Sequence, residues 1–360
     1  MYRTCLTILG ALTLAAVIAA APQPTTNAPY EVLKTARVGG EGGWDYIYAD
    51  VAGRRLYIPR RGAPPVQTRL SVYNLDTLDL VGEIEGVGGN GAAVDPKSGH
   101  GFTSSRPPSM FDTKTMKLIK TIDVGKAAPD GIVFDDFNDR VYVFSHPTKD
   151  ATVIDSKDGT VLGTIDLGGV PEQGVPDGKG MLYVVMQDAQ GSVTAVDVKT
   201  MKAIAHYPLG DKGGCNGLAF DPKNRILFAA CARSGDPDTM PPKPMMVVLQ
   251  AYDGKILTSL PLAGGSDGAV FNPNTMEAFS SQRDGTLTII KENTPTSFEV
   301  EQTVQTKPGC KTSSLDSKNN RIVLICTERA PESGAASERP PEGRGGRGGP
   351  GYLDVLWVGR

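Results

Sequence analysis

The sequence predicts an all-β fold, a seven-bladed β-propeller built of four-stranded blades. Three observations lead to this prediction: the composition, a unit that recurs seven times, and a strand-like segment left over at each end of the chain. The 360 residues include 43 Gly and 27 Pro, and the apolar runs are short and rich in Val, Ile and Thr. This composition disfavours long helices and favours short strands joined by turns.

The first 20 residues, MYRTCLTILGALTLAAVIAA, are typical of a secretory signal peptide. A basic start at Arg3 precedes an apolar run that is short for a membrane-spanning helix, although a retained anchor is the alternative interpretation. We expect cleavage after Ala19 or Ala20, followed by a short linker at 21–29. No later segment is apolar enough to span a bilayer. The mature protein is therefore expected outside the cytoplasm, without a membrane span.

The recurring unit is clearest in GWDYIYADVAGRRLYIPRR at 43–61 and PDGIVFDDFNDRVYVFSH at 129–146. Each copy has a short strand, a turn rich in Asp, Pro, Asn and Gly, and a second strand, which is the pattern of a hairpin. A second hairpin, such as ATVIDSKDGTVLGTIDLG at 151–168, follows most copies, and four strands in about 44 residues make a propeller blade. The residue before the turn, here called the anchor, recurs every 40 to 51 residues. The seven anchors are Asp50, Asp95, Asp135, Asp177, Asp221, Asn272 and Asp316.

The two ends of the chain together complete the last blade. Only one clear strand, GYLDVLWVGR at 351–360, follows the seventh copy, whereas YEVLKTARV at 30–38 precedes the first copy. Pairing these two segments closes the ring and leaves no open sheet edge. Residues 30–360 then form a single propeller. Its Gly-, Pro- and Arg-rich stretch at about 330–351 is expected to be a disordered loop.

These repeats also resemble a known family. LYVVMQDAQGSVTAVDVKTMKAIAHYPLG and VYVFSHPTKDATVIDSKDGTVLGTIDLG look like the YVTN-type, YncE-like repeat of bacterial exported seven-bladed propellers. The likeness covers nearly all of the mature chain, and it is weakest in the second blade, where GFTSSRPPSMFDTKT compresses the outer hairpin. The resemblance implies the fold and export to the bacterial periplasm or out of the cell, but no particular activity, because one fold carries many functions.

A polar residue lies five positions before each anchor, at the start of each innermost strand. Seven equivalent positions in a closed ring share one mouth of the central channel, so we expect a ring of polar side chains there. Four carboxylates, two amides and one ammonium suit a hard cation or an amine-bearing ligand. The alternative is that they satisfy backbone donors in turns. The ring consists of Asp45, Asn90, Asp130, Glu172, Asn216, Asp267 and Lys311.

A second, mainly basic ring is expected where the next strands return to the same face. Its side chains either form salt bridges with the first ring or hold a carboxylate or phosphate of a ligand. His146 and Asp130, at the two ends of one hairpin, are also a candidate base and orienting carboxylate, with a plain surface histidine as the alternative. Long connections leave on this face as well, which favours it for function. The second ring consists of Arg61, Arg106, His146, Gln187, Arg233, Arg283 and Arg329.

Two classes of function fit these residues. The first is a binding module that takes a small molecule or a protein at the mouth and loops of this face. The alternative is a lactone or ester hydrolase in which Ca²⁺, the candidate cofactor, is held by Glu172, Asn216 and Asp267 and polarises a carbonyl group. The sequence has no Cys-x-x-Cys-His haem-attachment motif, and its three histidines lie in different repeats without metal-ligand spacing, so binding is favoured over catalysis. A net charge of −3 gives no indication of nucleic-acid binding, and we expect a monomer.

Four cysteines are expected to form two disulfides. In GGCNGLAFDPKNRILFAAC and PGCKTSSLDSKNNRIVLIC, the cysteines lie six residues before and ten residues after the anchor. If the anchor Asp221 pairs with Arg225, the two cysteines of the first stretch face each other across the strands, and the same register applies to the second. Export permits oxidation, and free buried thiols are the alternative. The expected pairs are Cys215–Cys231 and Cys310–Cys326.

Overall fold

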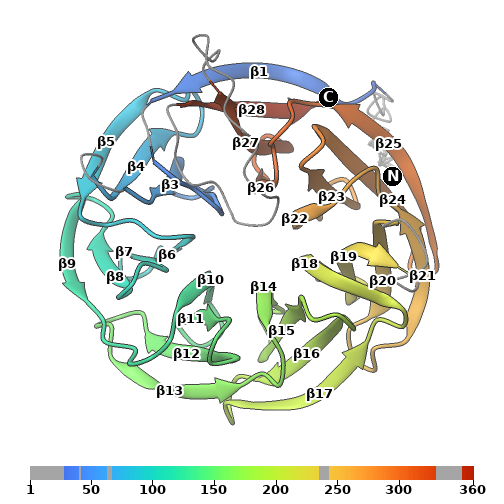
Figure 1. Ribbon diagram of the computed structural model, residues 1–360, viewed down its shortest axis with the longest axis horizontal. Coiled ribbons are helices and arrows are strands. Elements are labelled where there is room, and N and C mark those ends of the chain that lie inside the picture. The colour runs from blue at the N-terminus through green and yellow to red at the C-terminus, as the bar shows by residue number, and fades with distance from the viewer. Residues whose placement is uncertain (1–27, 40–41, 63–66, 235–242, 330–350) are drawn as a thin grey trace, which may run out of the picture.

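The computed structural model describes residues 28–39, 42–62, 67–234, 243–329 and 351–360, and it confirms the seven-bladed propeller. Seven four-stranded antiparallel sheets stand around a central axis (Figure 1). Within the described ranges there is no helix that is long and apolar enough to cross a membrane. The signal peptide predicted at 1–20 lies outside the described residues.

The first six blades follow one another along the chain, and the strands of each run in sequence order from the axis outward. Blade 1 has β2 (Tyr48–Asp50), β3 (Arg55–Arg60), β4 (Arg69–Asn74) and β5 (Leu80–Glu85). Blade 2 has β6 (Ala92–Asp95), β7 (His100–Thr103), β8 (Ser109–Asp112) and β9 (Lys117–Thr121). Blade 3 has β10 (Pro129–Asp135), β11 (Arg140–Ser145), β12 (Asp150–Asp155) and β13 (Val161–Asp166).

The remaining blades keep this pattern except at the closure of the ring. Blade 4 has β14 (Pro171–Pro176), β15 (Met181–Met186), β16 (Ser192–Asp197) and β17 (Lys202–Pro208). Blade 5 has β18 (Lys212–Asp221), β19 (Ile226–Ser234), β20 (Met245–Gln250) and β21 (Ile256–Pro261). Blade 6 has β22 (Ser266–Asn272), β23 (Glu277–Gln282), β24 (Thr286–Thr294) and β25 (Ser297–Gln305). Blade 7 has β26 (Thr312–Asp316), β27 (Arg321–Arg329), β28 (Gly351–Gly359) and β1 (Glu31–Val38).

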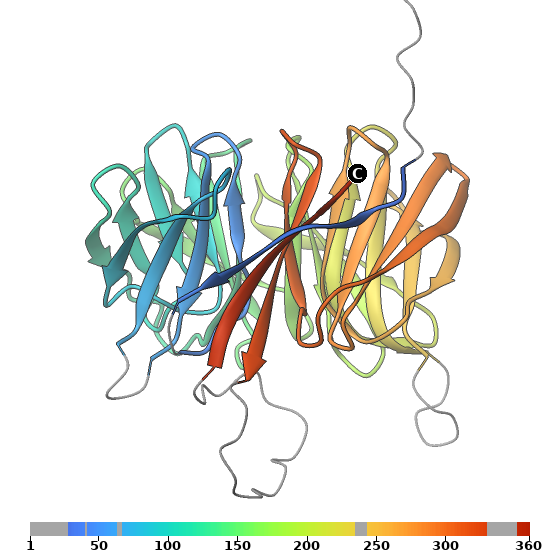
Figure 2. The ribbon, with the colours of Figure 1, turned by 90° about the horizontal axis from the view of Figure 1, so that it is seen from above.

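The N-terminal strand closes the ring as predicted. β1 pairs with β28 from Glu31 opposite Gly359 to Val38 opposite Leu353, which makes it the outermost strand of blade 7. Figure 2 shows β1, in blue, running across the red strands of this blade. The loop predicted at 330–351 needs one correction, because Gly351 already belongs to β28. The rest of that loop lies outside the described residues.

Packing between blades explains why the middle strands are apolar and the outer strands alternate. In β15, five consecutive residues are buried, because neighbouring blades cover both faces of the strand. β25 instead alternates exposed and covered residues, because only its inner face meets another blade. The buried residues form clusters between adjacent blades, such as Tyr142 and Phe144 of blade 3 against Leu182 and Val184 of blade 4. Shared clusters of this kind make the blades depend on their neighbours for a core.

The anchors fix the inner hairpins. In most blades the anchor side chain accepts a hydrogen bond from the backbone N–H two residues further on, as Asp221 does from Lys223 at 2.8 Å. The last residue of the turn takes the left-handed conformation, with φ of 57° at Arg225. Because Arg225 belongs to the turn, Asp221 pairs with Ile226, and the register assumed from the sequence is wrong by one residue.

Both predicted disulfides are nevertheless confirmed, Cys215–Cys231 and Cys310–Cys326. The pairing of β18 with β19 shifts by one residue around Asn216, which brings Cys215 opposite Cys231 after all. A β-bulge of this kind places two residues of one strand against one of the other. The turn and the bulge each shift the pairing by one residue in opposite directions, so the two cysteines still face each other as the sequence predicted.

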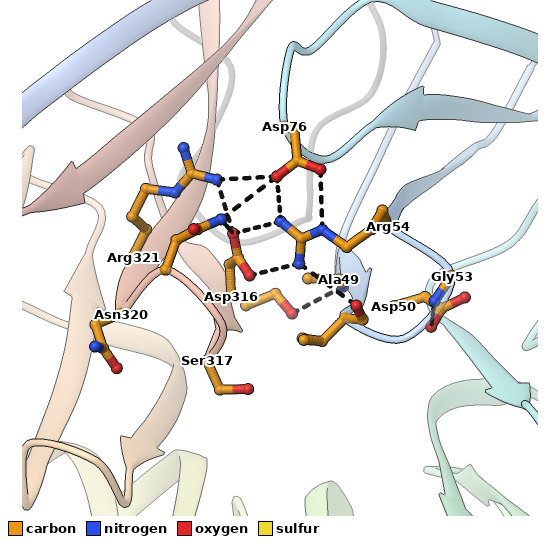
Figure 3. Close-up of polar contacts among 12 residues, drawn as sticks. Ala49, Asp50, Gly53, Arg54, Asp76, Asp316, Ser317, Asn320 and Arg321 are labelled. Carbon is orange, nitrogen blue, oxygen red and sulfur yellow. Dashed lines mark hydrogen bonds and ion pairs between the residues drawn. The ribbon is translucent and has the colours of Figure 1, made fainter.

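A network of charged groups joins blade 7 to blade 1 on the face opposite the ring residues (Figure 3). Arg54, in the turn of blade 1, donates two hydrogen bonds to the anchor Asp316 of blade 7, at 2.7 and 2.9 Å. Arg54 also donates to Asp76, and Arg321 donates to Asp316 at 2.8 Å. Burial opposes ionisation of Asp316, but these guanidinium groups outweigh it and hold its pKa well below the usual range.

Candidate functional site

The ring residues of blades 3 to 6 lie where the innermost strand is bulged. In each of these blades the pairing with the second strand shifts in register around the ring residue. A bulge leaves its extra residue without a partner opposite and re-aims the side chain. This explains how a residue of a sheet can contact its counterpart in the next blade. The four bulged residues are Asp130, Glu172, Asn216 and Asp267.

One group of side chains at this mouth is the carboxylate–histidine cluster, defined as Asp130, His146 and Glu172. His146 Nε2 lies 2.9 Å from Asp130 Oδ2 and 3.5 Å from Glu172 Oε1. The sequence placed His146 and Asp130 at the two ends of one hairpin, with a pair of base and carboxylate and a plain surface histidine as the two interpretations. Their side chains are 33% exposed for His146, 15% for Asp130 and 10% for Glu172, so the imidazole is the accessible member.

Neutral donors from blades 1, 2 and 4 surround this cluster. Tyr46 Oη donates to Glu172 Oε2 at 2.7 Å, and Gln187 Nε2 donates to Glu172 Oε1 at 2.5 Å. Asn90 donates its amide to Asp130. With these donors in place, both carboxyl groups are held in fixed orientations by residues that carry no charge of their own.

The other group is the lysine cluster, defined as Lys311, Asp45, Asp267 and Arg283. Lys311 Nζ lies 2.5 Å from Asp45 Oδ1 and 3.0 Å from Asp267 Oδ2, and Arg283 pairs with the same Asp267 oxygen. Asn216 donates to the other oxygen of Asp267 at 3.1 Å. Two cations match two carboxylates here, so this part of the mouth neutralises itself.

The ionisation of the two clusters differs accordingly. Burial, reinforced by the Asp130 carboxylate, raises the pKa of Glu172 to about 8. Burial opposes protonation of His146, but Asp130 outweighs it and raises the imidazole pKa above its ordinary value. In the lysine cluster burial also opposes ionisation of Asp267, yet Lys311 and Arg283 lower its pKa. Carboxyl groups are therefore in excess only at the carboxylate–histidine cluster.

Ring residues meet in these two clusters, whereas much of the predicted second ring lies apart. Arg61 donates to the backbone carbonyl of Trp44 at 3.2 Å, and Arg233 pairs with Gly213 along the strands of blade 5. Arg106 is exposed and lines a separate cavity of about 400 Å³. For Arg329 only the backbone pairing with Gly351 is described. Among the second-ring side chains that the structure describes, those of His146, Gln187 and Arg283 contact the first ring.

Tyr46 and Gln173 are site residues that the sequence argument missed. Both occupy the position after the ring residue, where blades 2, 3, 5 and 6 have glycine. Tyr46 reaches from blade 1 to Glu172 of blade 4. Gln173 Oε1 accepts the backbone N–H groups of Leu218 and Ala269, each at 3.0 Å, so it links blade 4 to blades 5 and 6. The sequence signal that could have identified them is the replacement of this recurrent glycine by a large polar residue.

Comparisons with solved structures give the same architecture. A chain of the Kuenenia stuttgartiensis hydrazine synthase superposes with a TM-score of 0.67 at 16% identity, covering 79% of this chain and 93% of that one. A chain of the mitotic checkpoint complex gives 0.68 at 10% identity, with coverages of 88% and 95%. U3-55K gives 0.69 at 8% identity, with coverages of 91% and 99%. The shared feature is the seven-bladed propeller fold.

At these identities the likeness concerns the fold alone. No family model matches the chain. No curated protein sequence matches it either. The residues of the mouth are therefore interpreted from their own chemistry.

Proposed function

We propose that this protein is an exported binding module of the YVTN-type propeller class, which takes a small molecule or a protein partner at the mouth. The carboxylate–histidine cluster is the observation that carries the proposal. Its ionisable groups are more than half buried and come from two blades, with neutral donors from two more. Burying such groups is unfavourable unless they are compensated, and clustered titratable groups with shifted pKa values are typical of functional sites.

Two further observations support this function. The signal-like N-terminus and the two disulfides fit an oxidising compartment outside the cytoplasm. A chain of the mitotic checkpoint complex has the same fold and belongs to a protein assembly. A rigid ring with functional residues on one face is well suited to binding a protein partner.

Capture of ligands from the native compartment tests the proposal. Immobilised mature protein should retain specific molecules, identified by mass spectrometry, and the Asp130→Ala/Asp267→Ala variant, which alters both clusters of the mouth, should lose them. The matched control is Lys117→Ala/Lys120→Ala on the exposed outer strand β9, which should retain the same molecules. Thermal melting would verify that both variants fold. Identical bound molecules for wild type and the mouth variant would exclude a role of the mouth.

The metal-assisted lactone or ester hydrolase is the second candidate, favoured by the ligand types of the carboxylate–histidine cluster. Carboxylates and imidazole are groups that hold catalytic metal ions, which polarise a carbonyl group or activate water. A panel of lactones and aryl esters, assayed with added Ca²⁺ or Zn²⁺ and with a chelator, tests this activity. Metal-dependent hydrolysis that is lost in Glu172→Gln would establish it, and the absence of turnover in every condition would remove it.

A further inference from the structure

We propose that Asp130, His146 and Glu172 bind a divalent transition-metal ion of the Zn²⁺ class, with an open coordination position facing the mouth. The inference rests on the proposed function, because it names the ligand class for one side of the same mouth. It differs from the Ca²⁺ group predicted from the sequence, with which it shares only Glu172.

The separations between the donor atoms suit such an ion. Bonds of about 2.0 to 2.1 Å in a tetrahedral site place neighbouring ligand atoms about 3.3 Å apart. The distances from His146 Nε2 to the two carboxylate oxygens, 2.9 and 3.5 Å, lie on either side of that value. One donor atom of each of the three residues lies within 4.8 Å of the others. Small side-chain movements therefore suffice to form the site.

The surrounding hydrogen bonds are those expected around metal ligands. Ligating carboxylates and imidazoles are usually oriented by outer hydrogen bonds, which raise affinity and fix the tautomer. Here Tyr46 and Gln187 donate to Glu172, and Asn90 donates to Asp130. The two carboxylate ligands are thus pre-oriented by groups from three blades.

The type of donor distinguishes this ion from Ca²⁺. Ca²⁺ takes six to eight oxygen ligands, whereas imidazole suits Zn²⁺ and neighbouring transition metals. In the Ca²⁺ group predicted from the sequence, Asp267 already accepts hydrogen bonds from Asn216 and Arg283 and forms an ion pair with Lys311. Its carboxylate is consequently engaged by cations of the protein itself.

Charge and access also favour the carboxylate–histidine cluster. The lysine cluster is balanced, whereas here two carboxyl groups face a single imidazole. A divalent ion would balance them. Three protein ligands leave the fourth tetrahedral position to water or to a ligand, as in catalytic zinc sites. His146, with a third of its side chain exposed, lies on the accessible side.

Zinc titration of the mature protein, purified without chelators and then stripped of metal, tests the inference. Competition with a chromogenic chelator should show one Zn²⁺ per chain, which Ca²⁺ in large excess does not displace. His146→Ala should abolish this binding. Tyr46→Phe, which keeps the ring and removes only the hydrogen bond to Glu172, should weaken it by about tenfold or more.

Two control variants separate this site from adventitious binding. His206→Ala removes another of the three histidines, and Asp267→Asn alters the lysine cluster of the same mouth. Both should bind Zn²⁺ like wild type. Circular dichroism and melting curves would verify folding of every variant. Absence of stoichiometric Zn²⁺, displacement by Ca²⁺, or an equal loss in His206→Ala would overturn the inference.

The outcomes also separate this inference from the proposed function. Ligand capture that depends on Asp130 and Asp267, in a wild-type protein that binds no zinc, would overturn the metal site and leave the binding module standing. Zinc binding that depends on His146, without any capture at the mouth, would support the metal site and remove the binding module.

Discussion

Gly217 shows how closely the innermost strands approach one another at the mouth. A Cβ atom added at Gly217 would lie 2.7 Å from the backbone carbon of Gly268 in the next blade. Gly131 has the same relation to blade 4, with 2.7 Å to the carbonyl oxygen of Glu172. These neighbouring atoms belong to the backbone and cannot rotate away as a flexible side chain can, so the two blades would have to move apart to accommodate the added methyl group. These glycines thus set the spacing at which ring side chains can meet.

We predict that Gly217→Ala destabilises the propeller by about 1 to 3 kcal/mol, the usual cost of overpacking. Denaturant unfolding would measure this change. Gly265→Ala is the matched control, because its added Cβ would meet only Ala232 at 3.9 Å, an ordinary contact distance. Equal stability of the two variants would show that the blades tolerate wider spacing.

Glu292 is a buried carboxyl group in blade 6, far in sequence from the mouth residues of blades 3 and 4. Asn224 donates to its Oε1 at 2.7 Å, whereas its Oε2 has no hydrogen-bond partner among the described residues. Burial, together with the Asp221 carboxylate, raises the pKa of Glu292 to about 7. The folded protein therefore holds a proton there that the unfolded chain releases near pH 4.

The expected consequence is a contribution to stability that decreases as the pH rises from about 4 to about 7. Below this range both states bind the proton, and above it both have released it. Glu292→Gln carries no charge and should therefore be more stable than wild type at pH 8, with a smaller difference at pH 5. Melting temperatures of the two proteins across this range would measure it. A difference in melting temperature that does not change with pH would contradict the raised pKa of Glu292.

Asp316, at the end of β26, connects blade 7 to blade 1. It is fully buried and binds Arg54 of the next blade and Arg321 of its own hairpin. Related contacts recur elsewhere, as Arg225 of blade 5 binds the anchor Asp177 of blade 4 at 3.1 Å. The anchors therefore shape their own turns and also accept donors from neighbouring blades.

Asp316→Asn should destabilise the protein by about 3 kcal/mol at pH 7, because it leaves two guanidinium groups without their shared carboxylate. The depressed pKa gives the sign of the pH dependence. The stabilisation is complete above the unfolded pKa near 4 and decreases as the pH falls below it, so the variant and wild type should converge in acid. Denaturant unfolding at several pH values would measure the difference. Asp139→Asn, in the exposed pair with Lys97, should change stability little.

The strands and blades were more predictable from the sequence than the candidate site. Repeats, turn residues and the leftover strands at both ends are local signals, so the blades and the closure by β1 followed from them. The register at Asp221 was off by one residue because Arg225 belongs to the turn, and the bulge at Asn216, which carries no local signal, could not be predicted. The clusters depend on which side chains of different blades meet. That Glu172 lies with His146 and Tyr46 follows only from the three-dimensional arrangement.

At the scale of the whole molecule, the ring is held closed by one strand from the other end of the chain. β1 alternates exposed and covered residues and pairs with β28 along its length. Tyr30, beside β1, is buried against Phe279 of blade 6 and donates to Glu277. The N-terminal segment thus connects blade 7 to blade 6 as well as completing its sheet.

A chain that begins at residue 39, without β1, should therefore lose stability and associate, whereas a chain that begins at residue 28 should behave like the mature protein. Removing β1 exposes the hydrogen-bonding edge of β28, and an unpaired edge is a template for pairing with another molecule. Melting curves and light scattering would compare the two chains. A peptide of residues 28–39, added in trans, should restore the melting temperature by adding the missing strand. A monodisperse truncated chain with an unchanged melting temperature would show that three strands suffice for blade 7.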